Sequence, residues 1–396
     1  MNEHAERIRR LQERLLQLQI DGCMITQNVD LYYFTGSMQT GYLFVPNEGE
    51  AVFFVRRSVV RAEEESSIIV EPLGSFRSFG ERLADVYHSL FQAAHSRHLR
   101  FAAEFDVLPV QQLKRLEAVL PQVEWVDGSL LIRELRMIKS AVEVERIREA
   151  GRIINLAFED ALDKLRPGML ELELMSHIET YVRRAGHIGI MRMRGYNQEV
   201  ITGMIGAGAA AAMPTYFDGP AGGQGLSPAS PQSASRRPIA PNEPILIDIG
   251  CCIDGYVIDQ TRTVVIGALD EDLLQAYEQS ERIIRSVESK LLPGTVCEQL
   301  YMHSLQMAHA AGLSDHYMGY GDDQVKFLGH GIGLEIDELP VLAKGFSYQL
   351  QPGMVIAVEP KFTFPQRGVV GIENSYVITD TGFDKLTVSR EGLIQL

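Results

Sequence analysis

The sequence contains few cysteines and no long apolar run. Its four cysteines are Cys23, Cys251, Cys252 and Cys297. Their spacing matches neither a disulfide framework nor a zinc finger. The longest nearly apolar run, residues 201–213, is too short to cross a membrane. The opening MNEHAERIRRLQ is charged from its third residue and lacks the apolar segment of a signal peptide. We therefore expect a reduced, cytoplasmic protein without a membrane partner, with Cys251 and Cys252 acting as small buried hydrophobic residues.

The sequence also lacks an excess of basic residues. Its 37 Lys and Arg stand against 52 Asp and Glu, which gives a formal net charge of −15. A nucleic-acid partner or an anionic membrane surface would require a basic patch, so we expect neither. With 45% apolar and 22% charged residues, the composition is that of a soluble globular protein. A length of 396 residues is enough for two or three domains.

The hydrophobic pattern predicts an α/β unit over residues 1–135 and a second unit over residues 136–396. Within the first unit, residues 4–20 have the periodicity of an amphipathic helix. The segments GCMITQNVDLYYFTGS and YLFVPNEGEAVFFVRRS predict strands, with turns at Asn28 and at residues 47–49. Nothing in this unit clusters His, Cys or carboxylates. We expect it to pack, dimerise or shape a cleft.

A long helix and an internal repeat mark the second unit. Ser140 followed by Glu143 is a capping box that opens a helix ending near residues 166–168. LRPGMLELEL at residues 165–174 is matched by LLPGTVCEQL at residues 291–300, an offset of 126. Two helical layers, each followed by carboxylate-bearing strands, predict a pseudo-twofold α/β domain. The alternative is a chance match, because Pro-Gly after a helix is common.

Two aspartates in residues 245–263 are the first candidate site residues. Asp248 and Asp259 each lie in a run of β-branched and aromatic residues, where Asp is depleted and an unpaired buried carboxylate is costly. Gly255 marks a turn between them, so two carboxylates on neighbouring strands of a hairpin are expected to face one another. The alternative is an edge strand whose aspartates are solvated.

Three further residues join this pair. His330 lies between glycines in FLGHGIG, Glu359 ends the run MVIAVEP, and Glu373 enters the run GIENSYVITD. Four carboxylates buried together would repel and could not all stay ionised without cations. Two divalent metals would solve this problem, and ligation by oxygens with one nitrogen suits Mn²⁺, Co²⁺, Fe²⁺ or Zn²⁺.

The order and spacing of these five residues resemble the pita-bread metallopeptidase family, in its Xaa-Pro aminopeptidase and prolidase branch. In that family the hairpin carries two Asp eleven residues apart, as Asp248 and Asp259 are here. The GHGIG, VEP and IEN motifs fall where the family has its remaining ligands. DGCMITQNVDLYYFTG is similar to the creatinase/prolidase N-terminal domain, and LIRELRMIKSAVEVERIREA to the linker and first catalytic helix. The resemblance covers nearly the whole chain.

The resemblance implies a small α/β N-terminal domain followed by a pita-bread catalytic domain. It also implies a dinuclear-metal peptidase, with Mn²⁺ or Co²⁺ preferred, that hydrolyses short peptides with a hydroxide bridging the two ions. Asp259, His330, Glu359 and Glu373 would hold one metal, and Asp248 would complete the second, with Asp259 and Glu373 bridging. Glu359 would transfer the proton of the attacking water to the leaving nitrogen. A homodimer is a further expectation from the resemblance.

Three positions depart from the Xaa-Pro pattern, and all would face substrate. The family has His, His and Arg where this chain has Thr215, Asp337 and Gly371. Asp337 would act as a base, bind a cationic substrate group, or hydrogen-bond a backbone turn. The assignment of Thr215 depends on the alignment of the unusual segment that follows it.

That segment, residues 218–238, is rich in Gly, Pro, Ser and Ala, which predicts a loop. It either borders the site or is a mobile linker, and its Arg236 and Arg237 either bind an anion or are solvated. The alternatives to a peptidase are a metal-dependent lyase or non-peptide hydrolase on the same fold, similar to dimethylsulfoniopropionate lyases, and a catalytically silent binding protein.

Overall fold

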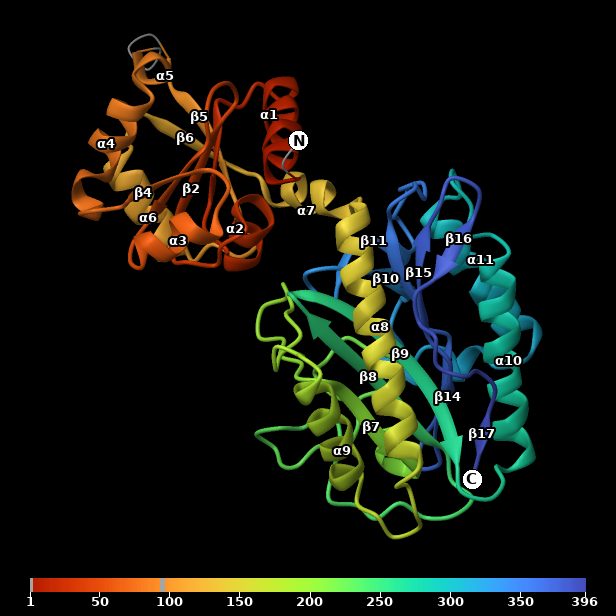
Figure 1. The fold of residues 1–396 in the computed structure, drawn as a ribbon. Helices are drawn as coiled ribbons and strands as arrows, with labels where there is room; N and C mark the ends of the chain where they lie inside the picture. The colour runs from red at the N-terminus through yellow and green to blue at the C-terminus, as the bar shows by residue number, and fades with distance from the viewer. Residues whose placement is uncertain (1–2, 93–96) are drawn as a thin grey trace. The chain divides into compact units, whose positions relative to one another are not determined.

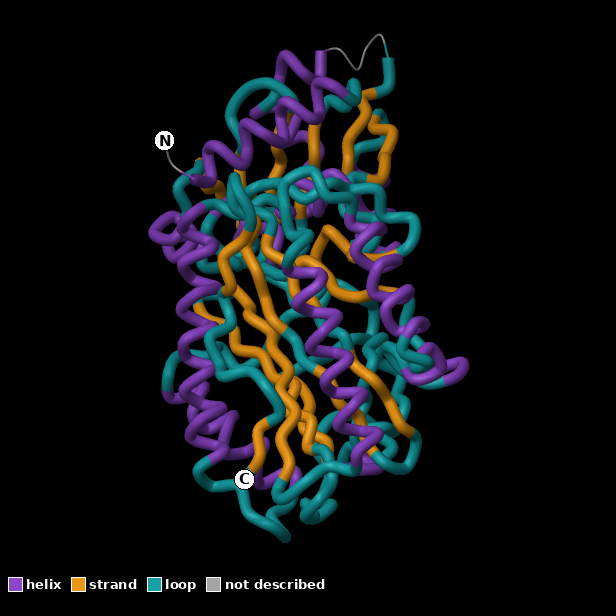
Figure 2. The backbone as a smooth tube through the Cα atoms, turned by 90° about the vertical axis from the view of Figure 1, so that its right-hand side faces the viewer, coloured by secondary structure: helices purple, strands orange, loops and turns teal. Residues whose placement is uncertain are grey.

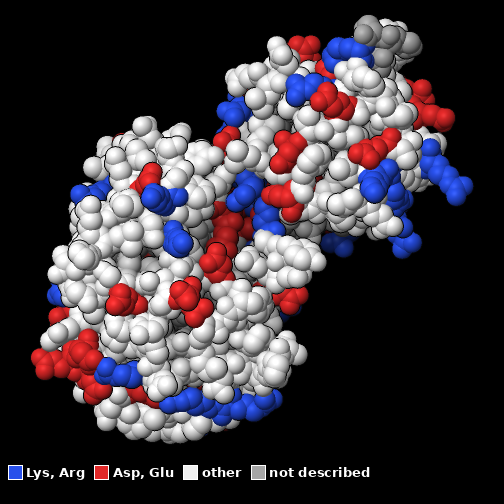
Figure 3. Space-filling model, turned by 180° about the vertical axis from the view of Figure 1, so that it is seen from behind, with Lys and Arg blue, Asp and Glu red and all other residues white. Residues whose placement is uncertain are grey.

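The chain forms two compact units, Met1–Arg136 and Met137–Leu396. A computed structural model describes residues 3–92 and 97–396 (Figure 1). Both units mix helices and strands, so the predicted α/β class is confirmed. Within the described ranges, no helix combines the length and apolar character needed to cross a membrane. On the face drawn in Figure 3, acidic and basic side chains are interspersed.

The first unit is built on one six-stranded sheet in the order β4-β3-β2-β1-β5-β6. The strands are β1 (Gly22–Ile25), β2 (Gly41–Pro46), β3 (Val52–Val55), β4 (Ile69–Pro72), β5 (Leu99–Ala103) and β6 (Val123–Asp127). The helices are α1 (Glu3–Gln17), α2 (Asn28–Thr35), α3 (Val59–Glu65), α4 (Phe79–Val86), α5 (His88–Gln92), α6 (Val110–Val119) and α7 (Ser129–Met137). β1, β2 and β3 pair antiparallel, whereas β4, β5 and β6 join parallel to their neighbours. Buried Phe44, Phe54, Phe79 and Phe101 are part of the core on one face of this sheet.

The strands predicted over residues 22–37 are half correct, because β1 is a strand but the segment after the turn predicted at Asn28 is the helix α2. Gln27 caps its start, with a side-chain oxygen that accepts from the backbone N–H of Asp30. Gly36 ends it in the left-handed region, at φ 85°. The buried carboxylate of Asp30 lies 2.7 Å from the guanidinium of Arg136. Local capping and this distant ion pair therefore outweigh the β preference of the aromatic residues.

The second unit contains two larger sheets and a hairpin. The first sheet has the order β17-β9-β8-β7 and the second β11-β10-β12-β15-β16, while β13 pairs with β14. The helices are α8 (Ala141–Leu162), α9 (Glu171–Arg184), α10 (Glu271–Glu288) and α11 (Cys297–Ala310). The strands are β7 (Gly203–Ala207), β8 (Ile245–Ile253), β9 (Tyr256–Val265), β10 (Phe327–Gly331), β11 (Glu338–Ala343), β12 (Val355–Val358), β13 (Lys361–Phe364), β14 (Gly368–Gly371), β15 (Asn374–Ile378), β16 (Phe383–Lys385) and β17 (Ile394–Gln395). Short 3-10 helices lie at Phe76–Ser78 in the first unit and at Gly208–Ala210, Ser314–His316 and Gly321–Asp323 in the second.

The predicted repeat is visible in the helices of this unit. The offset of 126 residues that relates the two Pro-Gly segments also relates both ends of α9 to both ends of α11. It relates the end of α8 to the end of α10 as well. α8 and α9 pack on β7, β8 and β9, whereas α10 and α11 pack on β10, β11, β13 and β14 (Figure 2). Each half is therefore a helical pair laid over strands, as the repeat predicts.

Local sequence signals position the first of these helices. Ser140 Oγ accepts from the backbone N–H of Glu143, and the Glu143 side chain accepts from the N–H of Ser140. This capping box is the predicted one, and it starts α8 at Ala141. The four cysteines are buried and unpaired, in agreement with the prediction that Cys251 and Cys252 act as hydrophobic residues.

Candidate metal centre

The hairpin β8–β9 places two carboxylates on the same face of the first sheet. Asp248 pairs with Thr261, and Asp259 pairs with Gly250. Asp259 and Thr261 are two residues apart and therefore share a face, so Asp248 and Asp259 are diagonal neighbours. β8 and β9 lie between β7 and β17. The alternative of an edge strand with solvated aspartates is therefore excluded.

The second sheet contributes the other three predicted residues. His330 lies on β10 opposite Ala357 of β12, and Glu359 follows the end of β12. Glu373 lies between β14 and β15. A single bridge between Thr261 and Glu373 joins the two sheets at this point. The five predicted residues therefore converge where the sheets meet.

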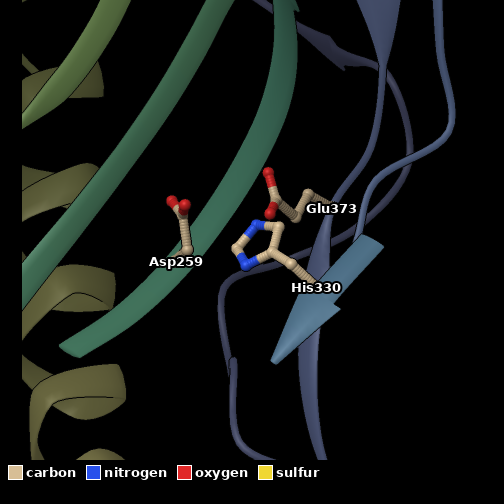
Figure 4. A group of neighbouring side chains, drawn as sticks. All are labelled: Asp259, His330 and Glu373. Carbon is tan, nitrogen blue, oxygen red and sulfur yellow. The ribbon is translucent and has the colours of Figure 1, made fainter. Parts of the chain in front are cut away.

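Three of these side chains have the geometry of a cation site. Asp259, His330 and Glu373 point toward one another from three segments (Figure 4), and each offers a ligand atom within 4.8 Å of the other two. Thr261 donates to Glu373 Oε2 at 2.7 Å. Glu373 Oε1 is buried and has no hydrogen-bond partner among the described residues. A buried acceptor without a partner is costly, and a bound cation would remove that cost, so these residues fit a divalent ion.

A cation that the sequence reasoning missed lies beside them. Lys361 opens β13 and is 1% exposed. Its Nζ lies 2.6 Å from Glu359 Oε2, 3.0 Å from Asp248 Oδ2 and 3.1 Å from Glu373 Oε2. One signal was available, because residues two apart in an extended segment share a face and Lys361 is two residues after Glu359. A lysine is nevertheless rarely fully buried, which favoured a surface position.

Burial and mutual repulsion set the charge of the centre. Burial raises the pKa of Glu359 to about 7, even though Lys361 opposes this rise. Burial, together with Glu373 and Asp248, raises the pKa of Asp259 well above its ordinary value. Burial also opposes ionisation of Glu373, but Lys361 and His330 hold its pKa below the ordinary value. For Lys361, burial lowers the pKa, and the three surrounding carboxylates raise it further than burial lowers it. The site is thus short of positive charge.

Arg262 is a second buried cation, and its hydrogen bonds hold the segment that contains Glu373. It lies on β9, is fully buried, and donates to the backbone carbonyl oxygens of Glu373, Ser389 and Arg390. A further bond goes from its guanidinium to the side-chain oxygen of Asn374. These bonds fix Glu373, Asn374 and the segment at Ser389 and Arg390 against the first sheet.

The converging residues line a pocket with the predicted loop at its border. Asp248, Asp259, His330, Glu359 and Glu373 line it, as does Asp337. The loop contributes residues 218–222 and 232–233, so the first alternative for this segment holds. Arg237 of the loop pairs with Glu243, which favours a structural role for this arginine over anion binding.

Asp337 and Thr215 occupy different positions. Asp337 Oδ1 lies 3.4 Å from His330 Nδ1, and its side chain is 47% exposed. Thr215 is not among the residues that line this pocket but lines a neighbouring one, and its expected contact with substrate stays a prediction. Thr215 packs so closely on Gly222 that a Cβ atom there would lie 2.6 Å from Thr215 Cγ2. Residues 217–222 line both pockets.

Two family profiles match the chain. The profile described as metallopeptidase family M24 matches residues 145–380, which is more than half of the chain. The chain belongs to metallopeptidase family M24. A second profile, described as the creatinase/prolidase N-terminal domain, matches residues 7–138. The prediction of a prolidase-type chain with these two domains is thereby confirmed, and the protein is a metal-dependent hydrolase of this family.

Relatives of this M24 chain match it from end to end. A Xaa-Pro dipeptidase of Pyrococcus furiosus is 28% identical over 392 residues, which cover 98% of this chain and 99% of that protein. A Xaa-Pro dipeptidase of Pyrococcus horikoshii is 26% identical, with the same coverage. The crystal structure of the prolidase from Pyrococcus horikoshii OT3 has a TM-score of 0.80 at 25% identity and covers 98% of this chain and 100% of its own. A Xaa-Pro dipeptidase from Bacillus anthracis has a TM-score of 0.83 at 23% identity, with 99% and 100% covered, and supports the fold.

Proposed function

We propose that this protein hydrolyses short peptides at an Xaa-Pro bond. The convergence of Asp259, His330 and Glu373 beside Glu359 in one pocket carries the proposal. The full-length match to proteins named Xaa-Pro dipeptidase supports the substrate class. Carboxylate oxygens with one imidazole suit Mn²⁺ or Co²⁺, and Fe²⁺ or Zn²⁺ are also compatible. The proposal requires one divalent ion in the pocket and does not depend on a second one.

The residues that would hold the metal and move the proton are distinct. Asp259, His330 and Glu373 would hold a divalent cation, which when bound supplies Lewis-acid polarisation of the scissile carbonyl and a more acidic water. Glu359 is buried at the pocket and has its pKa raised to about 7, so near neutral pH it can accept a proton and later return it. We assign to Glu359 the transfer of a proton from water to the leaving nitrogen.

We expect Asp337 to bind a positively charged group of the substrate. Its carboxylate lines the pocket, is 47% exposed, and lies on the side of His330 that faces away from Glu359. A short peptide with an unblocked N-terminus carries a cationic α-amino group, and an anionic side chain at the pocket would attract it. We therefore propose that Asp337 binds the peptide amino group.

The test is hydrolysis by the full-length protein after metal is stripped and restored. Separate samples would be loaded with Mn²⁺, Co²⁺, Fe²⁺ or Zn²⁺ and incubated with a mixed peptide library read by mass spectrometry, with Asp259→Asn alongside. Cleavage of Xaa-Pro bonds that the variant lacks would support the proposal. A metal-loaded wild type that cuts no peptide would refute it, and the search would move to elimination or other hydrolysis at Asp337.

Two further expectations accompany the proposal. The resemblance implies a homodimer, and the composition implies a cytoplasmic location; both stay predictions. Sedimentation equilibrium of the full-length chain would distinguish one copy from two.

A further inference from the structure

Lys361 occupies a position that suits a cation bound by several carboxylates. The ammonium group has three N–H donors and no acceptor. Three carboxylates from three different segments lie within 3.1 Å of Nζ, namely those of Asp248, Glu359 and Glu373. Each N–H group can therefore donate to one carboxylate, and the ammonium occupies the position that a small cation bound by these three carboxylates would have. A second cation at the same oxygen atoms would be repelled by the ammonium and would compete for the same lone pairs.

The residue opposite Lys361 is a glycine, which leaves room for the lysine side chain. Lys361 pairs with Gly371 across the β13–β14 hairpin. A Cβ atom at Gly371 would lie 2.6 Å from Lys361 Cγ and 2.7 Å from the carbonyl oxygen of Pro360. The hairpin therefore has room for a side chain at only one of these two paired positions, and in this chain that side chain is Lys361. Gly371 is the position at which the family pattern has an arginine, so this departure from the pattern accommodates the buried lysine.

With the Lys361 ammonium in place, the carboxylates and His330 leave a position for one further cation. Asp259, His330 and Glu373 can meet a common ion, and Glu373 Oε1 faces no partner among the described residues. Asp248 differs from these three, because its Oδ2 already lies at an ion-pair distance from Lys361. Of the two sites implied by the family, the one that depends on Asp248 is the one that the ammonium fills.

We infer that the Lys361 ammonium takes the place of the second divalent cation, so that this M24 centre binds one metal ion, held by Asp259, His330 and Glu373. The positive charge of Lys361 is covalently attached and cannot be removed by a chelator. The inference concerns the cation content of the centre and does not depend on which bond the protein cleaves.

The test is the number of ions bound per chain, measured without substrate. Full-length protein would be stripped with a chelator, titrated with Mn²⁺ by calorimetry, and analysed for metal after dialysis. We expect one ion for wild type and two for Lys361→Met, which keeps the apolar stem and removes the charge. The matched control is Lys139→Met, because Lys139 is also a buried lysine, 2.9 Å from Glu338, outside the cluster. This control should still bind one ion.

Each outcome bears on the inference. Two ions in wild type, or none, would overturn it, as would a single ion in a folded Lys361→Met protein. If that variant does not fold, the wild type alone decides, because the EPR spectrum of Mn²⁺-loaded protein distinguishes an isolated ion from an exchange-coupled pair. A protein that binds one ion and cleaves no peptide would refute the proposed function and leave this inference standing.

Discussion

Each unit of the molecule buries a cluster of carboxylates around one cation, and the two clusters differ in how their charge is matched. In the first unit, Asp30 is paired with Arg136 at 2.7 Å. Glu104 Oε2 accepts from the backbone N–H groups of Thr26 and Gln27. In the second unit, Lys361 is shared among three carboxylates, and Asp259 adds a fourth.

The difference separates a structural cluster from a chemical one. In the first cluster Arg136 pairs with Asp30, and backbone N–H groups donate to Glu104 Oε2, although Glu104 Oε1 is buried without a hydrogen-bond partner among the described residues. The second cluster has four carboxylates, one lysine and one histidine, and an oxygen of Glu373 has no partner among the described residues. A buried surplus of negative charge is unstable without a cation. The second cluster has the larger excess of carboxylates, and among the described residues it is there that a histidine and two carboxylates offer ligand atoms to one ion, so it is the cluster that we expect to bind a cation.

The largest effect should come from removing the proton-transfer group of the second cluster. Glu359→Gln keeps an oxygen that can accept from Lys361 but cannot exchange a proton near neutral pH. We expect kcat on the best peptide to fall by about 10²–10⁴-fold. The measurement is steady-state kinetics with bound metal determined on the same sample. A loss below about tenfold, with metal retained, would remove Glu359 from its assigned role.

Removing the cation of the first cluster should cost stability and not catalytic chemistry. Arg136→Met removes the guanidinium that lies 2.7 Å from the buried carboxylate of Asp30, and we expect the free energy of unfolding of this unit to fall by about 3–5 kcal/mol. Trp125, the single tryptophan of the chain, packs against Phe101 in this unit, so its fluorescence reports on this unit during urea unfolding. Arg133→Met on the same helix is the control. Equal losses in both variants would show that the ion pair with Asp30 is not the cause.

Removing metal with a chelator should lower the stability of the second unit and leave that of the first unit unchanged. Metal that binds only the folded second unit stabilises that unit by about 2.7 kcal/mol at a free concentration 100 times its Kd. We expect chelator to lower the calorimetric transition of the second unit and abolish hydrolysis, while the Trp125 transition keeps its midpoint. A Trp125 transition that shifts as far as the other would show that the metal acts on both units.

The smallest effect concerns Glu104 and depends on pH. Burial, and next the charge of Asp30, raise the pKa of Glu104 well above its ordinary value. A carboxyl group whose pKa is higher in the folded than in the unfolded state contributes stability below its unfolded pKa, and this contribution is lost as the pH rises through the folded-state pKa. Glu104→Gln mimics the protonated form, so it should stabilise the first unit by about 1 kcal/mol more at pH 8 than at pH 4.5.

Urea unfolding followed by Trp125 fluorescence at the two pH values checks this prediction. A stability difference between Glu104→Gln and wild type that is the same at both pH values would show that Glu104 does not bind a proton on folding. A difference that grows at low pH would reverse the sign and identify Glu104 as a carboxylate stabilised by its surroundings.

Local patterns allowed much of the fold to be predicted. The capping box at Ser140 starts α8, and the Pro-Gly repeat marks α9 and α11, because caps and turns depend on residues close in the sequence. The segment after the turn predicted at Asn28 was expected to be a strand for the same local reason, and there the prediction failed, because residues 28–35 form α2. Gln27 and the distant Arg136 stabilise a helix that the aromatic residues alone do not favour.

The sequence by itself determined the family and the five residues that converge, because a carboxylate or histidine in an apolar strand is too costly to be there without a partner. It did not determine where Lys361 points or that Thr215 lines a neighbouring pocket. Those positions depend on how two sheets and a hairpin meet, and on the missing side chain at Gly371 that leaves room for a lysine. The balance of charge at the centre is a sum over segments far apart in the chain, so only the tertiary structure decided it.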